Sequence, residues 1–178
     1  MGAIATKDYI RSTFLSMCQK TPLYKVSISE LCDRTEISRT TFYRYYDSIY
    51  DLAEELEEEH LEGFMEIARQ HAVKNNSIEE YMRDIISYIS EEESFFKWVL
   101  SEHSDRHFVN RWKRIIRADI IKEYHLDQKK LSGSDEVLIE MLISGAIGVY
   151  AYWLFHNSDL FAEQIIPLTV KMWDLNQM

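Results

Sequence analysis

The stretch that most constrains the fold of this chain is residues 27–46, Ser-Ile-Ser-Glu-Leu-Cys-Asp-Arg-Thr-Glu-Ile-Ser-Arg-Thr-Thr-Phe-Tyr-Arg-Tyr-Tyr. Ser27 and Glu30 have the spacing of a capping box, which predicts that a helix starts there. Ser38 is a second candidate N-cap only eleven residues further on. Because two caps so close together leave room for one short helix and a tight turn, we predict a helix–turn–helix unit.

The second helix of this unit, predicted over residues 38–46, has an outer face that core packing does not explain. Phe42 and Tyr46 lie four residues apart and are expected to face inward, which leaves Arg and Thr side chains facing outward. Arg pairs bidentately with guanine, Thr meets base edges, and Tyr and Arg hold phosphates, so the composition favours a recognition helix on double-stranded DNA. We expect base contacts from Arg39, Thr40 and Thr41, phosphate contacts from Ser27, Tyr43, Arg44 and Tyr45, and support from Lys7, Arg11 and Lys25.

Residues 38–46, Ser-Arg-Thr-Thr-Phe-Tyr-Arg-Tyr-Tyr, followed by Asp51-Leu52, resemble the recognition helix and the next helix start of the TetR family of bacterial transcriptional regulators. The usual pattern of that family is Ser-x-x-x-Phe-Tyr-x-His-Phe and then, a few residues later, Leu. The resemblance implies an all-α fold of about nine helices, with a three-helix DNA-binding domain over residues 1–47. It further implies a helical ligand-sensing and dimerisation domain over residues 48–178, and repression that a ligand relieves.

Two residues depart from the family pattern. Glu36 occupies the turn position where the family usually has Gly, at a cost of about 1 kcal/mol if the backbone keeps a positive φ. Ile49 stands where the family often has a phosphate-binding Lys, and Asp47 and Asp51 flank it. We therefore expect weaker anchoring of the DNA backbone at the start of the following helix.

The composition favours a helical protein whose charge is unevenly distributed. The 178 residues include only two Pro and five Gly, and the net charge is −10. Residues 1–50 hold seven Lys or Arg against five Asp or Glu, whereas residues 51–178 hold 13 against 25, so the acidic excess lies outside the expected DNA-binding domain. Cys18 and Cys32 are expected to be reduced core thiols, and no signal-peptide pattern opens the chain, so we expect a cytoplasmic protein.

Apolar periodicity predicts further helices over about residues 6–20, 48–71, 77–90, 94–100, 106–125, 135–155 and 160–175. Ser77 and Glu80 form a second capping box, and Pro167 predicts a kink or a later start in the last helix. His60 and His71 lie on the inner stripe of the helix over residues 48–71. Each is either a core residue or a polar contact for a ligand, and the aromatic residues nearby either pack a core or line a cavity for a small apolar or aromatic effector. The candidate ligand contacts are His60, Phe64, His71, Tyr81, Tyr88 and Trp112.

Residues 137–155 are nineteen residues with one charged side chain, Glu140, which is just long enough to span a bilayer. We favour a helix buried between its own domain and a second copy, because the stretch contains small and polar residues and lacks basic flanks. A two-fold homodimer burying more than about 2,000 Å² is therefore expected. The expected interface residues are Met141, Gly145, Gly148, Tyr152, Phe161, Ile165, Leu168 and Met172.

Several alternatives stay open at this point. The regulator could be an activator or a co-regulator that responds to a protein partner, and Lys7 and Arg11 fit a solvated helix surface as well as a phosphate contact. His103 and His107 have the i,i+4 spacing of metal ligands, but a polar loop entering a helix explains them better. We find no nucleophile-plus-base pair, phosphate loop or convincing metal spacing, and so expect no enzyme and no cofactor. A helical interaction module without DNA would leave the outer face of residues 38–46 unexplained.

Overall fold

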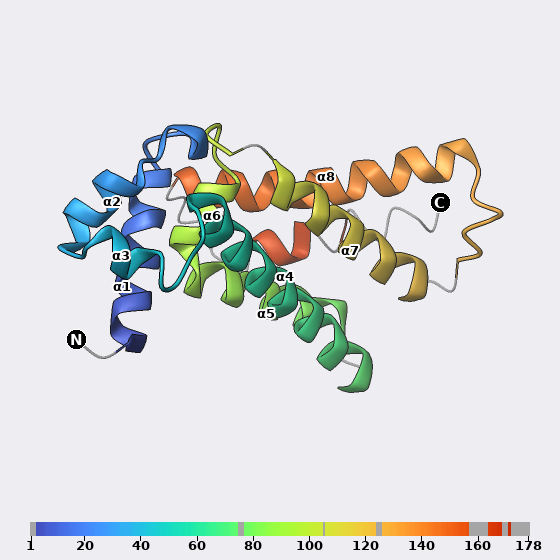
Figure 1. The fold of residues 1–178 in the computed structure, drawn as a ribbon. Coiled ribbons are helices and arrows are strands. Elements are labelled where there is room, and N and C mark those ends of the chain that lie inside the picture. Colours follow the sequence, from blue (N-terminus) through green and yellow to red (C-terminus); the bar gives the residue numbers. More distant parts are fainter. Residues whose placement is uncertain are drawn as a thin grey trace. The chain divides into compact units, whose positions relative to one another are not determined.

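A computed structural model describes residues 3–74, 77–104, 106–123, 126–156, 164–168 and 171 of the chain (Figure 1). All regular structure within these residues is helical, which confirms the predicted all-α class. The elements are α1 (Ala3–Cys18), η1 (Leu23–Lys25), α2 (Ile28–Thr35), α3 (Arg39–Phe42), α4 (Ile49–Lys74), α5 (Ile78–Glu91), α6 (Glu93–Val99), α7 (His107–Glu123) and α8 (Gly133–His156). Of the last predicted helix, 160–175, the structure describes residues 164–168 and 171, and these are helical.

The chain divides into two compact units. The first unit comprises Met1–Leu61 and Ser94–Phe108, and the second comprises Glu62–Glu93 and Val109–Met178. The helix α4 therefore contributes its first half to one unit and its second half to the other. This division follows packing, whereas the expected boundary at residue 47 concerns DNA binding and stays a prediction.

The core of the first unit is aromatic and draws on both of its chain segments. α1 packs against α2, and α2 against α3 (Figure 1). Phe14 of α1 and Phe42 of α3 are completely buried. The ring of Phe14 meets that of Trp98 of α6 edge to face, with centroids 5.2 Å apart. Such pairs add to the stabilisation from burial alone, so α6 belongs to the core that supports the helix–turn–helix.

His60 belongs to this same core. Its imidazole stacks on the ring of Phe95 with centroids 3.6 Å apart, and its Nδ1 lies 2.7 Å from the carbonyl oxygen of Leu56. Only 5% of the residue is exposed. The sequence left two roles open for His60, a core residue or a ligand contact. The structure packs it among aromatic side chains in the core of the first unit.

The second unit is built from the end of α4 with α5, α7 and α8. Phe64 and Trp112 stack with ring centroids 4.4 Å apart, and Tyr150 of α8 lies beyond Trp112. Two ion pairs join α7 to α8: Lys113 with Glu140 at 2.5 Å, and Arg117 with Glu136 at 2.7 Å.

Gly63 lies where α4 meets Tyr88 of α5. A Cβ atom at this position would overlap the Tyr88 hydroxyl and Cζ. The absence of a side chain at Gly63 therefore allows α4 and α5 to approach closely in the second unit.

Two local predictions were wrong. Ser27 is the N-cap residue of α2, but its side chain makes no cap hydrogen bond, and the Glu30 carboxylate accepts a 2.7 Å hydrogen bond from Arg34 instead. The ion pair with Arg34 competes with the reach back to the cap. The recognition helix is also shorter than predicted. After Phe42, the N–H groups of Arg44 and Tyr45 donate to carbonyls three residues back, so the final turn tightens.

Candidate nucleic-acid interface and ligand cavity

The turn between α2 and α3 is closed by Glu36, whose backbone is left-handed with φ 54° and ψ 32°. Its N–H and that of Ile37 both donate to the carbonyl of Cys32, which ends α2. A positive φ at this residue is the conformation expected where the family usually has Gly. Glu36 thus sets the direction in which the chain enters α3, although a side chain in this region of φ and ψ is disfavoured.

The start of α3 is fixed by Ser38. Its Oγ accepts a 3.0 Å hydrogen bond from the backbone N–H of Thr41, and the two hydroxyls lie 2.8 Å apart. This confirms Ser38 as an N-cap. Since the Thr41 hydroxyl is already bonded within the cap, Thr41 is less free to meet a base edge than Thr40 is.

The short helix is held by two buried rings. Phe42 is completely buried and Tyr46 is 2% exposed, with ring centroids 5.8 Å apart. Arg39, Thr40, Tyr43 and Arg44 are exposed, and Thr41 and Tyr45 are half-buried. The structure therefore presents Arg, Thr and Tyr side chains on a face whose opposite side is anchored in the core.

Lys25 and Ser27, expected phosphate contacts, lie just before and at the cap of α2. Both are exposed, and the Lys25 ammonium lies 5.6 Å from the ring centroid of Tyr24. The Ser27 side chain makes no cap hydrogen bond. Their position at the start of a helix suits an anionic phosphate, because backbone N–H groups point outward there.

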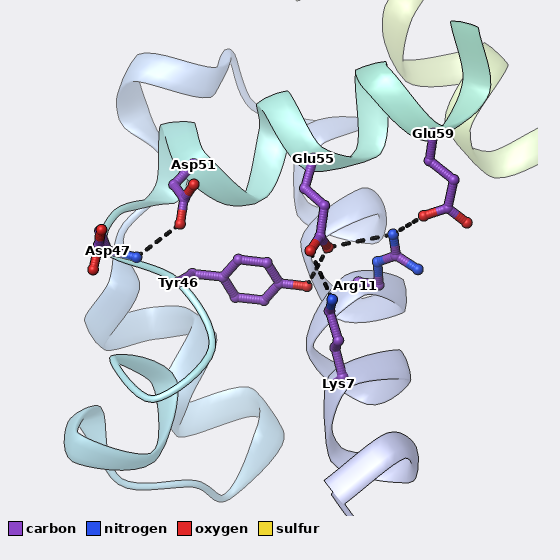
Figure 2. Close-up of polar contacts among 7 residues, drawn as sticks. All are labelled: Lys7, Arg11, Tyr46, Asp47, Asp51, Glu55 and Glu59. Atoms are coloured by element: carbon purple, nitrogen blue, oxygen red, sulfur yellow. Dashed lines mark hydrogen bonds and ion pairs between the residues drawn. The ribbon is translucent and has the colours of Figure 1, made fainter. Parts of the chain in front are cut away.

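Lys7 and Arg11 form ion pairs with carboxylates of α4. Figure 2 shows both side chains reaching from α1 to carboxylates of α4. Lys7 Nζ lies 2.6 Å from Glu55 Oε2, and Arg11 Nη2 lies 3.3 Å from Glu55 Oε1 and also pairs with Glu59. A phosphate would have to compete with these carboxylates for either cation. The sequence signal that could have predicted this pairing is two cations four residues apart and two carboxylates with the same spacing.

Glu55 also accepts a 2.9 Å hydrogen bond from the hydroxyl of Tyr46 (Figure 2). Burial raises the pKa of Glu55, but the hydrogen bonds from Lys7 and Tyr46 and the charges of Lys7 and Arg11 outweigh it, so the pKa is lowered. Burial and the neighbouring carboxylate raise the pKa of Tyr46. We call these residues, Lys7, Arg11, Tyr46, Glu55 and Glu59, the α1–α4 network.

The start of α4 is capped by Ser48, and the Asp51 carboxylate binds the backbone just before it. Asp51 Oδ2 accepts from the backbone N–H of Asp47 at 2.9 Å (Figure 2), and the Asp51 N–H donates to Ser48 Oγ at 3.1 Å. Ile49 is buried. A carboxylate and a buried apolar residue therefore stand where the family often has a phosphate-binding Lys.

The second unit contains a cavity between α4, α5, α7 and α8. Its volume is about 90 Å³. One water needs roughly 10–15 Å³, so the cavity has room for a small organic molecule. The lining residues are Phe64, Ala68, His71, Ala72, Tyr81, Met82, Ile85, Trp112, Ile115, Ile116, Asp119, Ile120, Lys122, Ala146 and Tyr150.

Four of the six candidate ligand contacts line this cavity, namely Phe64, His71, Tyr81 and Trp112, whereas His60 and Tyr88 do not. The His71 ring lies 4.7 Å from the Tyr81 ring, and its buried Nδ1 has no hydrogen-bond partner among the described residues. Sequence reasoning missed Asp119 and Tyr150. Asp119 follows Trp112 at i+7 on α7, a spacing that places both on one helix face.

α8 presents an apolar surface outside its own unit's core. Met141 is 64% and Tyr152 54% exposed, and Val137 and Phe155 continue this face. Gly148 is exposed, and a Cβ added there would meet nothing within 4 Å. Of the other expected interface residues, Gly145 is half-buried, Leu168 is exposed and Ile165 is 3% exposed, while Phe161 and Met172 lie outside the described residues. We call Val137, Met141, Gly148, Tyr152 and Phe155 the α8 face.

By length and hydropathy α8 would also be able to cross a membrane, with 39% of its most apolar stretch buried in this structure. One such helix is weak evidence of a membrane span, because core helices of soluble proteins share these properties. Within the described part of the chain, no three His, Cys, Asp or Glu residues are grouped so as to hold a metal ion. His107 instead lies with its Nδ1 2.9 Å from Glu57 Oε2.

Comparison with known proteins adds a family and a fold. Residues 76–174 match the TetR-type family described as the transcriptional regulator C-terminal region. The chain is 20% identical over 172 residues to the uncharacterized HTH-type transcriptional regulator YxbF of Bacillus subtilis (strain 168), covering 93% of this chain but only 43% of that protein.

Solved structures show the same fold. A TetR transcriptional regulator from Streptococcus agalactiae 2603V superposes with a TM-score of 0.69 at 21% identity, covering 96% of this chain and 94% of the other. A TerR/AcrR-family transcriptional regulator from Aquifex aeolicus VF5 gives a TM-score of 0.67 at 15% identity, covering 96% and 98%.

Proposed function

Since the chain belongs to the TetR family of transcriptional regulators, we propose that it is a cytoplasmic, sequence-specific repressor that binds a palindromic operator as a homodimer. A small effector in the cavity of the second unit releases it from DNA. The observation that carries the DNA-binding role is the exposed face of Arg39, Thr40, Tyr43 and Arg44, which buried Phe42 and Tyr46 anchor from behind. The role is regulatory and not enzymatic.

Each exposed side chain of this surface has a proposed task. Arg39 and Thr40, with Thr41 in second place because of its cap hydrogen bond, read base edges in the major groove. Tyr43, Arg44, Tyr45, Ser27 and Lys25 bind phosphates and fix the register of the protein on the duplex. Lys7 and Arg11 help hold α1 against α4, and they contact phosphates only where a phosphate displaces Glu55 or Glu59.

The effector step needs a difference in affinity. A ligand shifts the regulator away from DNA only if it binds the DNA-incompetent conformation more tightly than the competent one. The helix α4 is the proposed route, because it carries Glu55 of the α1–α4 network as well as Phe64 and His71 of the cavity. The second candidate, an activator or co-regulator that responds to a protein partner, uses the same DNA surface and differs in the sign of regulation.

Fluorescence anisotropy with the DNA upstream of the protein's own gene tests the DNA-binding role. Arg39→Ala should cost about 1–3 kcal/mol on the cognate sequence and relax sequence preference. Lys25→Ala should weaken binding to all sequences alike and reduce the salt slope by about one unit. Arg83→Ala, an exposed Arg on α5, is the control and should change neither. Equal losses on cognate and random DNA from Arg39→Ala would contradict the assigned base contact.

The homodimer is proposed from the α8 face. Its residues lie three, four or seven positions apart, spacings that place them on one side of the helix, as in a helix that packs against another helix. Met141→Lys should shift the protein from dimer to monomer in sedimentation equilibrium, whereas Met65→Lys, at a 41% exposed position on α4, should leave the dimer intact. A wild-type protein that sediments as a monomer at micromolar concentration would refute the dimer.

Repression and activation separate in the cell. Deleting the gene should raise expression from its operator if the protein represses, and lower it if the protein activates. An effect that requires a second protein added to the purified regulator would favour the co-regulator version.

A further inference from the structure

The cavity of the second unit has flat aromatic walls. Phe64 of α4 and Trp112 of α7 stack with an interplanar angle of 14°, and Tyr150 continues the stack 6.5 Å from Trp112 at 19°. Tyr81 of α5 and isoleucines of α5 and α7 line the remaining space. Because the stacked rings cover one another's faces, a ligand ring would meet their edges, and such edge-to-face contact favours a flat aromatic ring.

Polar groups also line the cavity. Asp119 of α7 is the carboxylate among the lining residues that the structure describes, and Lys122, the cation among them, is exposed. His71 Nδ1 is buried and finds no hydrogen-bond partner in the described part of the chain. The Tyr150 hydroxyl donates to Met82 Sδ at 3.3 Å, although a thioether is a weak acceptor.

These groups discriminate by charge. In the tautomer that carries its proton on Nε2, the buried Nδ1 of His71 is an acceptor without a partner, and a ligand N–H would remove its desolvation cost. The Asp119 carboxylate attracts a cation and repels an anion, whereas water screens the charge of the exposed Lys122 ammonium. A neutral ligand would gain the ring contacts but not the pairing with Asp119, and an anion would be repelled by it.

We propose that this cavity binds a small aromatic amine in its protonated form. The ring packs against the edges of the Phe64–Trp112 stack, and the ammonium group pairs with Asp119 and donates to His71 Nδ1. The modest space available favours a single ring with a short side chain. The inference rests on the proposed function in treating the cavity as the effector site, and adds the chemical class of the effector.

Three compounds with one ring and different head groups test the class. Isothermal titration of the purified full-length protein near neutral pH compares 2-phenylethylamine, 2-phenylethanol and phenylacetate. The amine should bind about tenfold or more tighter than the alcohol, in keeping with a desolvated charge-assisted contact, and phenylacetate should bind weakest. Equal affinity for amine and alcohol, a preference for phenylacetate, or no binding of the amine at millimolar concentration would each overturn the proposal.

Two variants assign the effect to the cavity. Asp119→Asn keeps the shape of the side chain and should remove most of the preference for the amine, while Asp84→Asn, exposed on α5, should keep it. Ala68→Leu fills part of the lining and should weaken all three compounds together. Circular dichroism confirms that each variant is folded, and a preference for the amine that survives in folded Asp119→Asn contradicts the assigned pairing.

Measuring DNA binding in parallel separates this inference from the proposed function. Amine binding without any change in operator affinity would refute release by an effector and leave the ligand class standing. Release of the operator by all three compounds alike would refute the ligand class and leave the regulator standing. Failure to bind any DNA would refute the proposed function, and the titrations would still report on the cavity.

Discussion

The hydroxyl of Tyr46 donates a 2.9 Å hydrogen bond to Oε1 of Glu55 and so ties the end of the helix–turn–helix to α4. The same carboxylate receives Lys7 and Arg11 from α1. One side chain therefore joins three parts of the first unit, and the orientation of the recognition surface depends on it. Removing any donor leaves Glu55 with fewer partners, which weakens the connection without emptying the core.

Tyr46→Phe should lower the free energy of unfolding by about 1–2 kcal/mol, because it deletes a hydrogen bond to a carboxylate and keeps the buried ring. Urea unfolding followed by circular dichroism measures the change. Tyr50→Phe removes the same hydroxyl from an exposed position of α4 and should have little effect. Equal stability of the Tyr46→Phe and wild-type proteins would show that Glu55 gains nothing from this donor.

The pH dependence of stability should depend on Glu55. Its pKa in the folded protein lies below the ordinary value of 4.5, so the folded state favours the carboxylate. The resulting stabilisation is fully present above pH 4.5 and is lost as the pH falls through the lower folded value. Glu55→Gln should be less stable than wild type near neutral pH and should lose less stability on acidification to about pH 3. Glu54→Gln, the exposed neighbour on α4, is the matched control. Parallel curves for Glu55→Gln and wild type would contradict this assignment.

Glu36→Gly should stabilise the protein by about 1 kcal/mol, because Gly adopts a positive φ without the steric cost of a Cβ. The identical substitution Glu54→Gly in the exposed face of α4 should destabilise it by about 0.5–1 kcal/mol, since Gly is a poor helix former. Thermal and urea unfolding of both variants measure the pair. The prediction is the opposite sign at the two positions, and a loss of stability in both would refute it.

Gly63→Ala should destabilise the second unit by about 1–3 kcal/mol, because displacing the overlapped Tyr88 ring, which also meets Phe64 edge to face, costs more than the roughly 1 kcal/mol that Ala gains over Gly in a helix. Gly133→Ala adds the same methyl group where nothing lies within 4 Å and should be close to neutral. Urea unfolding compares the two. If Gly63→Ala were as stable as wild type, Tyr88 would have to move aside at no cost.

The sequence predicted local helix geometry where one interaction dominates. At Ser77 and Glu80 both halves of the capping box form, with the Ser77 N–H donating to the carboxylate at 2.9 Å. The same spacing at Ser27 and Glu30 fails, because Arg34 lies one turn further on and takes the carboxylate. The difference lies in a competing partner that the capping pattern does not include.

Contacts between segments far apart in the chain were harder to predict from the sequence. Periodicity placed Phe64, His71 and Trp112 on inward faces, and these residues do line the cavity. It could not distinguish His60, which stacks on Phe95 thirty-five residues away. The pairing of Lys7 with Glu55, 48 residues apart, likewise follows from how α1 packs on α4 and not from either helix alone.

The Phe64–Trp112 stack has a practical consequence. Because the indole forms part of the cavity wall, its emission should change when a molecule enters, and no label is needed to see it. Trp98 sits in the core of the first unit and offers an internal reference from the same sample. The sequence has four Trp residues, of which positions 112, 153 and 173 belong to the second unit, so replacing Trp98 alone, or these three together, by Phe would make the emission report on one unit at a time.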